Sequence, residues 1–482
     1  MMALALLCAA LSSGCNVGPV YVKPVVETPV AFKEQPPEQV REAEGWKAAE
    51  PRDDMIRGKW WEVFHEPELN ALEGQAAGSN QSVAAALANF LAARAVVKQM
   101  QSQYFPTVTV DPSVTRSRQT SPPTGSKSSP TPFTITEYSL PFDASWEVDF
   151  WGRIRNSVKA SSLEAQATRA DLENVRLTVQ AEVVADYFQL RVLDAEMGLL
   201  DEAVAAYQES LKLTEVRYDT GLASGQDVEQ AGIQLNTTAA QATDLGIQRA
   251  QLEHAIATLV GKPASSFSIA TNVVVPEPVA VPFGVPSQLL ERRPDVAAAE
   301  RRVAEVNAQI GVARAAYFPA ITLGGSAGYQ SVLLRTLISG PSLLWSVGAS
   351  LAETIFDAGK RKAVTEQAEA QYQGTVANYR QTVLRAFQEV EDNLSTLRIL
   401  AKELQQQRAA VALSQGYLTL ANDRYETGVD SYLNVITAQT GLLSNQQTAM
   451  TLRMQQLTAT VQLVKALGGG WDVSQRTTET IP

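Results

Sequence analysis

The two cysteines of the chain, Cys8 and Cys15, both lie within its first 15 residues, where one of them could carry a lipid. The apolar stretch at 3–11 is too short to span a bilayer and has the length of an export-signal core. Small residues and then Cys15 follow it, which is the pattern of a lipoprotein signal whose cysteine is acylated after cleavage. Ser12 stands where leucine is usual, so an ordinary secretory signal is the alternative. Asn16, rather than aspartate, favours sorting to the outer membrane.

Little else in the chain could do chemistry. His65 and His254 have no cysteine near them in sequence, which argues against a zinc site or a histidine-dependent triad. There is no Walker motif, and 7 Met with 2 His form no metal-binding tract. The net charge of -11 argues against nucleic acid, whose phosphates need Lys and Arg. We therefore expect no enzyme, no cofactor, no metal and no nucleic-acid partner.

The sequence repeats itself over two units of about 200 residues each. Gln103–Thr109 matches Ala316–Thr322, and Asn80–Val83 aligns with Arg293–Val296 at the same offset. Further on, Arg217-Tyr218-Asp219-Thr220-Gly221 matches Arg424-Tyr425-Glu426-Thr427-Gly428. Because these landmarks share their order and spacing, the pattern predicts a duplicated domain.

Each repeat contains a long stretch without proline, at 142–262 and at 342–481, rich in good helix formers. Apolar residues recur there every three or four positions, as at Leu172, Val175 and Val179. A helix from about 155 to 218 would have roughly 60 residues and measure about 90 Å. Gly221 and Gly428 suit helix C-caps, with second helices starting near Asp227 and Leu433. Each repeat is thus predicted to form a long helical hairpin.

A different pattern precedes each long helix. Apolar and small polar residues alternate over about ten positions in four segments, near 107–117, 136–148, 320–330 and 342–352. This is the length and period of transmembrane β-strands, although a half-buried soluble sheet is the alternative. No later segment has 18 charge-free apolar residues without Pro or several Gly, so no transmembrane helix is expected.

Four such strands cannot stand alone in a bilayer, because their open edges would leave backbone groups unpaired in hydrocarbon. Known single-chain barrels start at eight strands, so each chain must supply one sector of a shared barrel. Two copies would give eight strands and three copies twelve. The helical hairpins would then continue such a barrel as a tube.

Several short motifs, in order, resemble those of the TolC-like outer-membrane factors, in particular the lipoprotein branch that serves resistance-nodulation-division (RND) pumps. These motifs cover nearly the whole mature chain. They are Trp60–Phe64, Pro67–Leu69, Leu290–Val296, both Tyr-Phe-Pro triplets, both Arg-Tyr turns and Leu467–Trp471.

The resemblance implies a mainly α fold with a transmembrane β part: a homotrimer with a 12-stranded β-barrel, four strands per chain, continued by a long periplasmic α-helical barrel. It implies docking on a periplasmic adaptor protein and an inner-membrane RND transporter, with the chain as a passive efflux duct. The location would be the outer membrane, with a palmitate-bearing lipid anchor on Cys15. A type I secretion channel and a structural periplasmic coiled-coil lipoprotein remain alternatives.

The resemblance also assigns roles at the periplasmic tip, formed by the turns at Arg217, Tyr218, Gly221, Arg424 and Gly428. Tyr425 and Asp227 match a latch pair between hairpins, and Leu433 matches a constriction. The acidic positions of the family are neutral here, as Asn434 and Thr437, and Asp430 replaces an arginine and could supply the acid ring. The alternatives are helix capping for Asp227 and Asp430 and simple packing for Tyr425.

The expected organisation is a signal peptide, a lipid-anchored and equatorial segment, a first repeat, an equatorial linker, a second repeat and a tail. Their respective ranges are 1–14, 15–79, 80–262, 263–291, 292–470 and 471–482.

Overall fold

The computed structural model describes residues 16–29, 32–34, 59–120, 132–276 and 292–469. The signal peptide, Cys15 and the tail predicted above lie outside these ranges, as does part of the equatorial linker. Contacts divide the chain into two compact units. Unit 1 consists of 1–25, 89–168 and 299–379, and unit 2 consists of 26–88, 169–298 and 380–482.

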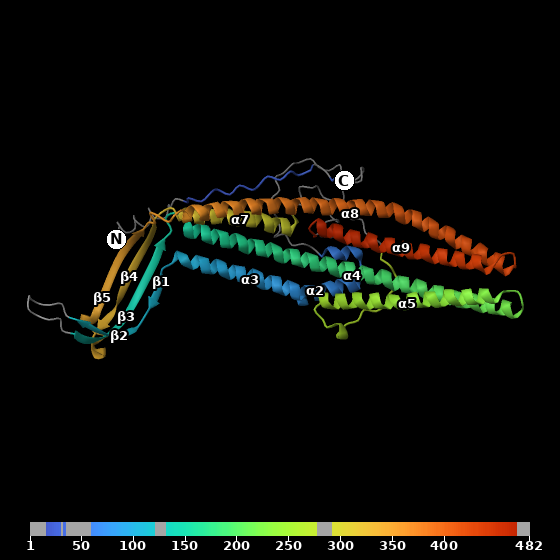
Figure 1. Ribbon diagram of the computed structural model, residues 1–482, viewed down its shortest axis with the longest axis horizontal. Helices are drawn as coiled ribbons and strands as arrows, with labels where there is room; N and C mark the ends of the chain where they lie inside the picture. The colour runs from blue at the N-terminus through green and yellow to red at the C-terminus, as the bar shows by residue number, and fades with distance from the viewer. Residues whose placement is uncertain (1–15, 30–31, 35–58, 121–131, 277–291, 470–482) are drawn as a thin grey trace, which may run out of the picture. The chain divides into compact units, whose positions relative to one another are not determined.

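Each repeat consists of a short helix, then β-strands, then two long helices, in the same order (Figure 1). The first has α3 (Gln81–Gln101), β1 (Thr107–Val110), β2 (Ser113–Thr120), β3 (Pro132–Val148), α4 (Arg153–Asp219) and α5 (Gly225–Leu259). The second has α7 (Pro294–Ala315), β4 (Ala320–Ser331), β5 (Leu343–Ala352), α8 (Lys360–Glu426) and α9 (Tyr432–Ala466). Since α4 and α8 both have 67 residues, and α5 and α9 both have 35, the two hairpins match in length.

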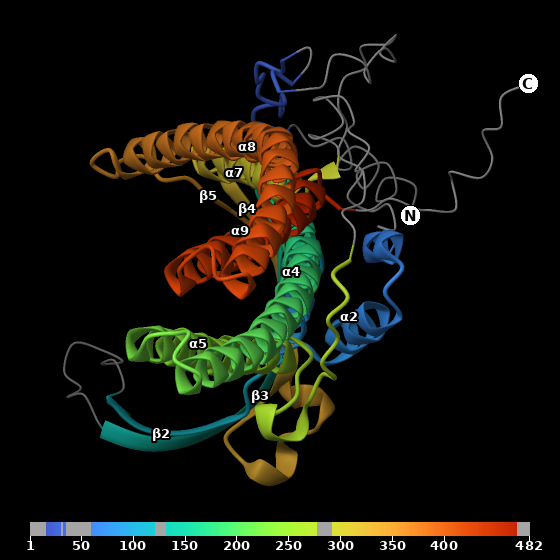
Figure 2. The same cartoon turned by 90° about the vertical axis from the view of Figure 1, so that its right-hand side faces the viewer.

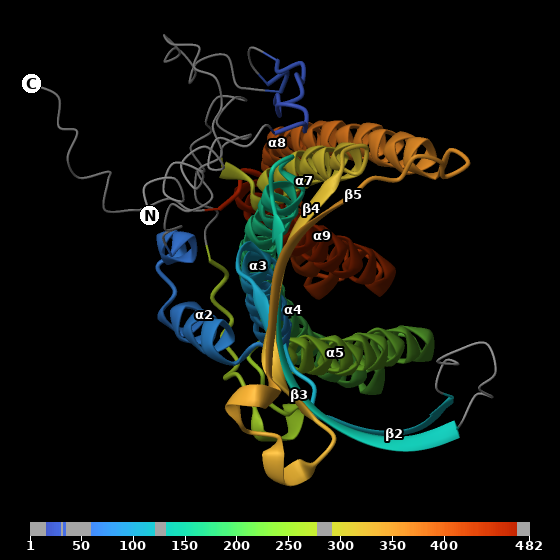
Figure 3. The same ribbon diagram turned by 90° about the vertical axis from the view of Figure 1, so that its left-hand side faces the viewer.

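Unit 1 carries one antiparallel sheet in the order β1–β3–β4–β5, with β2 also pairing β3. Figure 3 shows β4 and β5 side by side in this sheet. β1 and β2 are successive parts of one strand, since both follow a single register against β3. Asp111 and Pro112 separate them, and proline has no N–H to donate to a strand ladder. The sheet therefore has four strands, but the first is interrupted and β3 is 17 residues long, longer than the ten expected.

The start of α4 is fixed by Asp149. Its carboxylate accepts the backbone N–H groups of Ile154 and Arg155, at 2.9 and 2.8 Å. Asp357 does the same at α8, where it accepts the N–H of Arg361 at 3.1 Å. These bonds satisfy N–H groups that have no partner within the helix, so an aspartate stabilises the start of each long helix.

Unit 2 has a buried charge network on α4. Arg191, 1% exposed, donates to Asp194 at 3.1 Å and to the carbonyl of Ala270 at 2.8 Å, and it also pairs with Glu68. Arg249 of α5 binds Asp194 at 2.7 Å and the carbonyl of Ile269 at 2.8 Å. The backbone after α5 therefore makes its hydrogen bonds with these side chains.

The helix α2 (Pro67–Ser79) buries an acid in unit 2. Glu73 is 0% exposed, and neither of its carboxyl oxygens has a hydrogen-bond partner. Burial raises the pKa of this carboxyl to about 9, so it is protonated at neutral pH. A neutral carboxyl avoids the large cost of an unpaired buried charge.

One helical stretch of the described chain, Pro67–Tyr104, is long and apolar enough to cross a membrane, by length and composition only. In its apolar segment of 18 residues, only 6% of the residues are buried. A single stretch of this kind is weak evidence for a span.

The β3–β4 contact predicts a strict need for glycine at position 328. A Cβ there would lie 2.3 Å from the carbonyl oxygen of Leu140 and 2.6 Å from the Cα of Pro141, both backbone atoms that cannot move aside. We expect Gly328→Ala to destabilise the sheet by about 2 kcal/mol or more and to lower the amount of assembled channel in membranes. Heat-modifiable bands on gels measure this.

Gly324→Ala on the same strand is the matched control, because a Cβ there meets nothing within 4 Å. Equal losses in both variants would show that the close approach at Gly328 is not the cause.

Candidate functional site at the ends of the helical hairpins

Both hairpins of unit 2 end in a turn with the same construction (Figure 2). Gly221 and Gly428 have positive φ values of 73° and 76°, which favour glycine. The N–H of Leu222 binds the carbonyl of Arg217 at 2.7 Å, and that of Val429 binds the carbonyl of Arg424 at 2.9 Å. These bonds close the ends of α4 and α8 in the manner of a glycine C-cap.

Asp227 serves the helix that follows the first turn. Ser224 is the N-cap of α5, and the two side chains form a reciprocal capping box. The Asp227 carboxylate accepts from the backbone N–H and the hydroxyl of Ser224, both at 2.9 Å. Within one chain, Asp227 therefore acts as a helix-capping residue.

Tyr425 is buried at 6% exposure, and its contacts come from the other hairpin and from the following helix. The guanidinium carbon of Arg217 lies 4.6 Å from the centre of its ring. Its ring also packs on that of Tyr432 at 5.2 Å. The hydroxyl of Tyr425 is buried and has no hydrogen-bond partner in the described chain. The Tyr425–Asp227 bond implied by the resemblance is thus not formed within one chain.

Arg217 connects the two hairpins. Besides its position over Tyr425, it donates to the carbonyl oxygen of Glu426 at 3.1 Å. Because Arg217 lies in the last turn of α4 and Glu426 ends α8, the contact joins the two tips directly. A cation over an aromatic ring contributes roughly 0.5–2 kcal/mol, depending on how far water is excluded.

A second link between the hairpins involves residues that the sequence did not single out. The hydroxyls of Ser210 and Tyr432 share a hydrogen bond at 2.9 Å, and the Tyr207 hydroxyl donates to the carbonyl of Gln439 at 3.4 Å. Small buried residues form one cluster with Tyr425 and Tyr432, namely Ala231, Ala421, Val435 and Ala438. These partners are more than 200 positions apart, so no local pattern could pair them. The only sequence signal for this link was a tyrosine near each turn.

Asp430 is engaged within its own turn. Its carboxylate binds Arg424 Nε at 3.1 Å, the backbone N–H of Ser431 at 3.0 Å, and the side chain of Asn434. The hydrogen bond from Arg424 is the main cause that holds the pKa of Asp430 below its usual value. Asp430 therefore forms an ion pair with Arg424. The positive charge of Arg424 offsets the negative charge that a ring of Asp430 carboxylates would present.

Exposed apolar side chains lie at the same turns. Leu433 is 56% exposed on the first turn of α9. Leu222, Val429 and Tyr218 are likewise exposed beside the glycines. In one chain nothing covers these side chains, so they are available to face solvent, a channel axis or another protein.

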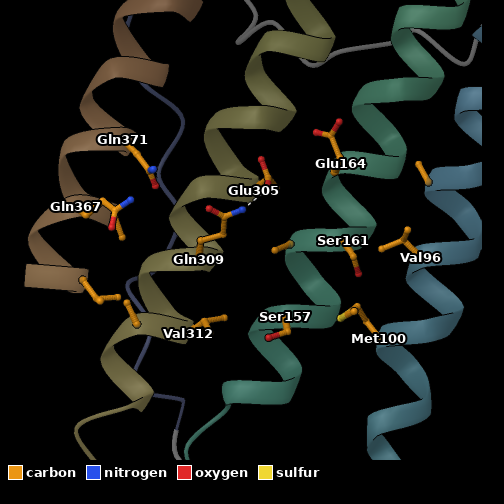
Figure 4. A pocket seen from close by; sticks show the side chains of 15 residues that line it. Val96, Met100, Ser157, Ser161, Glu164, Glu305, Gln309, Val312, Gln367 and Gln371 are labelled. Atoms are coloured by element: carbon orange, nitrogen blue, oxygen red, sulfur yellow. Dashed lines mark hydrogen bonds between the residues drawn. The ribbon is translucent and has the colours of Figure 1, made fainter. Parts of the chain in front are cut away.

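Unit 1 contains a groove of about 570 Å³ between α3, α4, α7 and α8 (Figure 4). Glu164 and Glu305 both line it. Burial, followed by the nearby charge of Glu164, raises the pKa of Glu305. Arg302 lies 3.7 Å from Glu164 and offsets part of this negative charge. Within the described chain, no group of three or more His, Cys, Asp or Glu residues could hold a metal ion.

Comparison with known proteins identifies the family. The model of a family described as outer membrane efflux protein matches residues 72–262 and 285–469, most of the chain. The chain belongs to this family. Its two matched segments correspond to the two repeats, and the family is one of efflux channels rather than enzymes.

Individual members share about a third of their residues with this chain. The toluene efflux pump outer membrane protein TtgF of Pseudomonas putida is 32% identical over 95% of each chain. The solvent efflux pump outer membrane protein SrpC of Pseudomonas putida is 34% identical over 86% of this chain and 88% of its own. The structure of the outer-membrane channel OprN superposes with a TM-score of 0.83 at 30% identity, covering 95% of this chain and 100% of that one.

These similarities establish the fold class predicted from the sequence. Structural neighbours are trimeric outer-membrane channels, in which a helical barrel continues a β-barrel. The protein is thus an outer-membrane channel of the kind that serves RND efflux pumps.

The tip contacts predict different results for two substitutions of Tyr425. If the ring under Arg217 links the hairpins, Tyr425→Phe keeps the link and Tyr425→Leu loses it, at a cost of about 1 kcal/mol per chain. We therefore expect Tyr425→Leu to raise the conductance of single channels in planar bilayers several-fold and Tyr425→Phe to leave it near wild type. Arg217→Gln is the partner variant and should resemble Tyr425→Leu.

A bond from the Tyr425 hydroxyl to Asp227 predicts a different result for Tyr425→Phe, because this substitution would remove the bond. If Tyr425→Phe raised the conductance as much as Tyr425→Leu, the hydroxyl rather than the ring would be the link.

Proposed function

We propose that this chain is the homotrimeric exit duct of a tripartite RND efflux pump, through which small molecules pass passively from the periplasm to the exterior. The observation that best supports this proposal is a four-stranded amphipathic sheet with two unpaired edges, followed in each repeat by a helical hairpin of the same length. Such a sheet is stable in a bilayer only when other copies complete its edges. Three copies supply twelve strands.

The duct itself needs no energy source and catalyses no reaction. Its partners are a periplasmic adaptor protein and an inner-membrane RND transporter, and the transporter drives export. The family match and the equal hairpins support this assignment, because the hairpin ends present exposed apolar side chains for contact. At the closed tip, Leu433 forms a constriction, while Arg217 and Tyr425 restrain its opening.

We propose that Cys15 carries lipid. The next residue, Asn16, is held at the junction of β3 and α4: the Asn156 side chain donates to its side-chain oxygen at 2.8 Å, and the N–H of Val17 donates to the carbonyl of Trp151 at 3.4 Å. β3 ends at this junction. A lipid on the preceding residue would therefore enter the membrane where the strand leaves it.

We propose that the cargo consists of apolar solvents and amphipathic antibiotics. Two relatives are named for toluene and solvent efflux and share about a third of their residues with this chain. The duct chooses little by itself, so the transporter selects the cargo.

The function predicts the phenotype of a deletion strain. Loss of the gene should lower tolerance to toluene and to antibiotics, measured as survival and minimal inhibitory concentration, and a plasmid copy should restore both. Deletion of the RND transporter alone should give the same phenotype, and the double deletion should add nothing. Unchanged tolerance together with a lost secreted protein would instead establish a type I secretion channel.

The lipid anchor has a separate test. Cys15→Ser should abolish incorporation of labelled palmitate, because no other cysteine remains after cleavage. Cys8→Ser is the matched control, since Cys8 lies within the signal and should leave labelling intact. Labelling of the Cys15→Ser protein, or none in the wild type, would contradict the assignment.

A further inference from the structure

The groove of unit 1 between α3, α4, α7 and α8 has the size of a small-molecule site (Figure 4). Its volume is about 570 Å³, and pockets that hold drug-sized ligands measure roughly 300–1,000 Å³. Val96, Met100 and Val312 supply apolar surface. A methionine side chain is flexible and polarisable, so it adapts to ligands of different shapes. The groove therefore offers room and apolar contact to a molecule of drug size.

The same groove is negatively charged. Among the described residues that line it, the charged ones are Glu164 of α4 and Glu305 of α7. Burial and then the negative charge of Glu164 raise the pKa of Glu305, so the two carboxylates lie close enough to repel each other. Arg302 lies 3.7 Å from Glu164 and offsets part of this charge, and the Gln309 amide donates to Glu305. A cation in the groove would offset the repulsion that remains.

The N-terminal segment shows which face of α7 is turned outward. The Asn307 amide donates to the carbonyl of Pro19 at 3.0 Å, and the Tyr21 hydroxyl donates to Glu300. Since Glu300 and Asn307 are seven positions apart, they share one face of the helix. A lipid on Cys15 would enter the bilayer around the duct only four residues before Pro19, so this face of α7 is the outer one.

The groove lies on the other face of α7. Glu305, Gln309 and Val312 line it. At 3.6 residues per turn, these three positions are roughly 120–180° around the helix from Glu300 and Asn307. The groove therefore opens away from the N-terminal segment, which in the proposed duct is the side of the lumen.

We propose that this groove binds amphipathic organic cations as they pass through the lumen. The apolar body of the cation lies against Val96, Met100 and Val312, and its positive charge lies between Glu164 and Glu305. This rests on the proposed function, to which it adds a preference for positive charge among the molecules that enter the duct. A cleft lined by charges of one sign raises the local concentration of the opposite charge, and three chains present three such grooves at one level.

Binding of ethidium, a fluorescent aromatic cation, tests the site. Purified full-length trimers in nanodiscs of zwitterionic lipid are titrated with ethidium, its fluorescence anisotropy is measured, and empty nanodiscs give the background. We expect saturable binding to the wild type and about ten-fold weaker binding to the Glu164→Gln, Glu305→Gln double variant, which keeps the side-chain volumes and removes both charges. Equal affinity of the two proteins would overturn the proposal.

Glu369→Gln on α8 is the matched control. It removes the same charge, but Glu369 lines a different groove together with Pro19 and Arg314, on the side of the N-terminal segment. Its ion pair with Arg314, at 2.8 Å, is about half exposed, so its loss costs little stability. We expect this variant to bind ethidium as the wild type does. A loss equal to that of the double variant would show that the total charge of the duct attracts the cation, and would overturn the site.

A neutral competitor tests the charge preference on the wild type alone. Phenanthridine, the ring system of ethidium without its fixed charge, is uncharged at neutral pH. We expect it to displace ethidium about ten-fold less effectively than an unlabelled aromatic cation of the same size. Equal displacement would make the groove an apolar site without charge preference and would overturn the proposal, even if the double variant failed to form heat-modifiable trimers.

Toluene tolerance of a deletion strain that carries the wild-type gene separates the two proposals, because toluene has no charge for the carboxylates to attract. If the gene restores tolerance but ethidium binds equally to the wild type and the double variant, the site is overturned and the exit-duct function stands. If ethidium binds with the expected differences but tolerance never depends on the protein, the site is supported and the function is overturned.

Discussion

A membrane-spanning sheet of four strands leaves the backbone N–H and C=O groups of its outer strands without partners, and hydrocarbon supplies none. This constraint shapes the whole chain. It makes the isolated sheet of β1 to β5 an incomplete object, with one side of β5 and one side of β1/β2 open. Completion by further copies satisfies those groups, and the duplicated helical hairpins then repeat around the same axis as the strands.

Duplication is the means by which one chain meets this constraint. The pairing of β3 with β4 is a junction between the two repeats inside the chain. Equal hairpins of 67 and 35 residues follow from both repeats. The repeats differ at Asp111 and Pro112, which interrupt the first strand of repeat one, whereas β4 in repeat two is continuous.

At the hairpin ends, the acidic side chains have partners within their own turns. Asp227 caps its own helix, and Asp430 is paired with Arg424, so both acids are already compensated within their turns. The contact between hairpins uses the cation of Arg217 over the ring of Tyr425 and the hydrogen bond of Ser210 with Tyr432. Such contacts, worth about 1 kcal/mol each, join the ends of the two hairpins.

The sequence alone determined the duplication, the long hairpins, the alternating strands and the glycine turns, because each rests on local spacing or on repetition along the chain. It also identified Asp227, Tyr425 and Asp430 as residues near the turns. Asp227 and Asp430 find their partners within their own turns, whereas the contacts between the hairpins were decided only by the tertiary structure. Arg217 reaches Tyr425, and Ser210 reaches Tyr432, across more than 200 positions, and nothing in the local pattern encodes which side chains meet there. The need for glycine at 328 likewise arises from the backbone of a neighbouring strand.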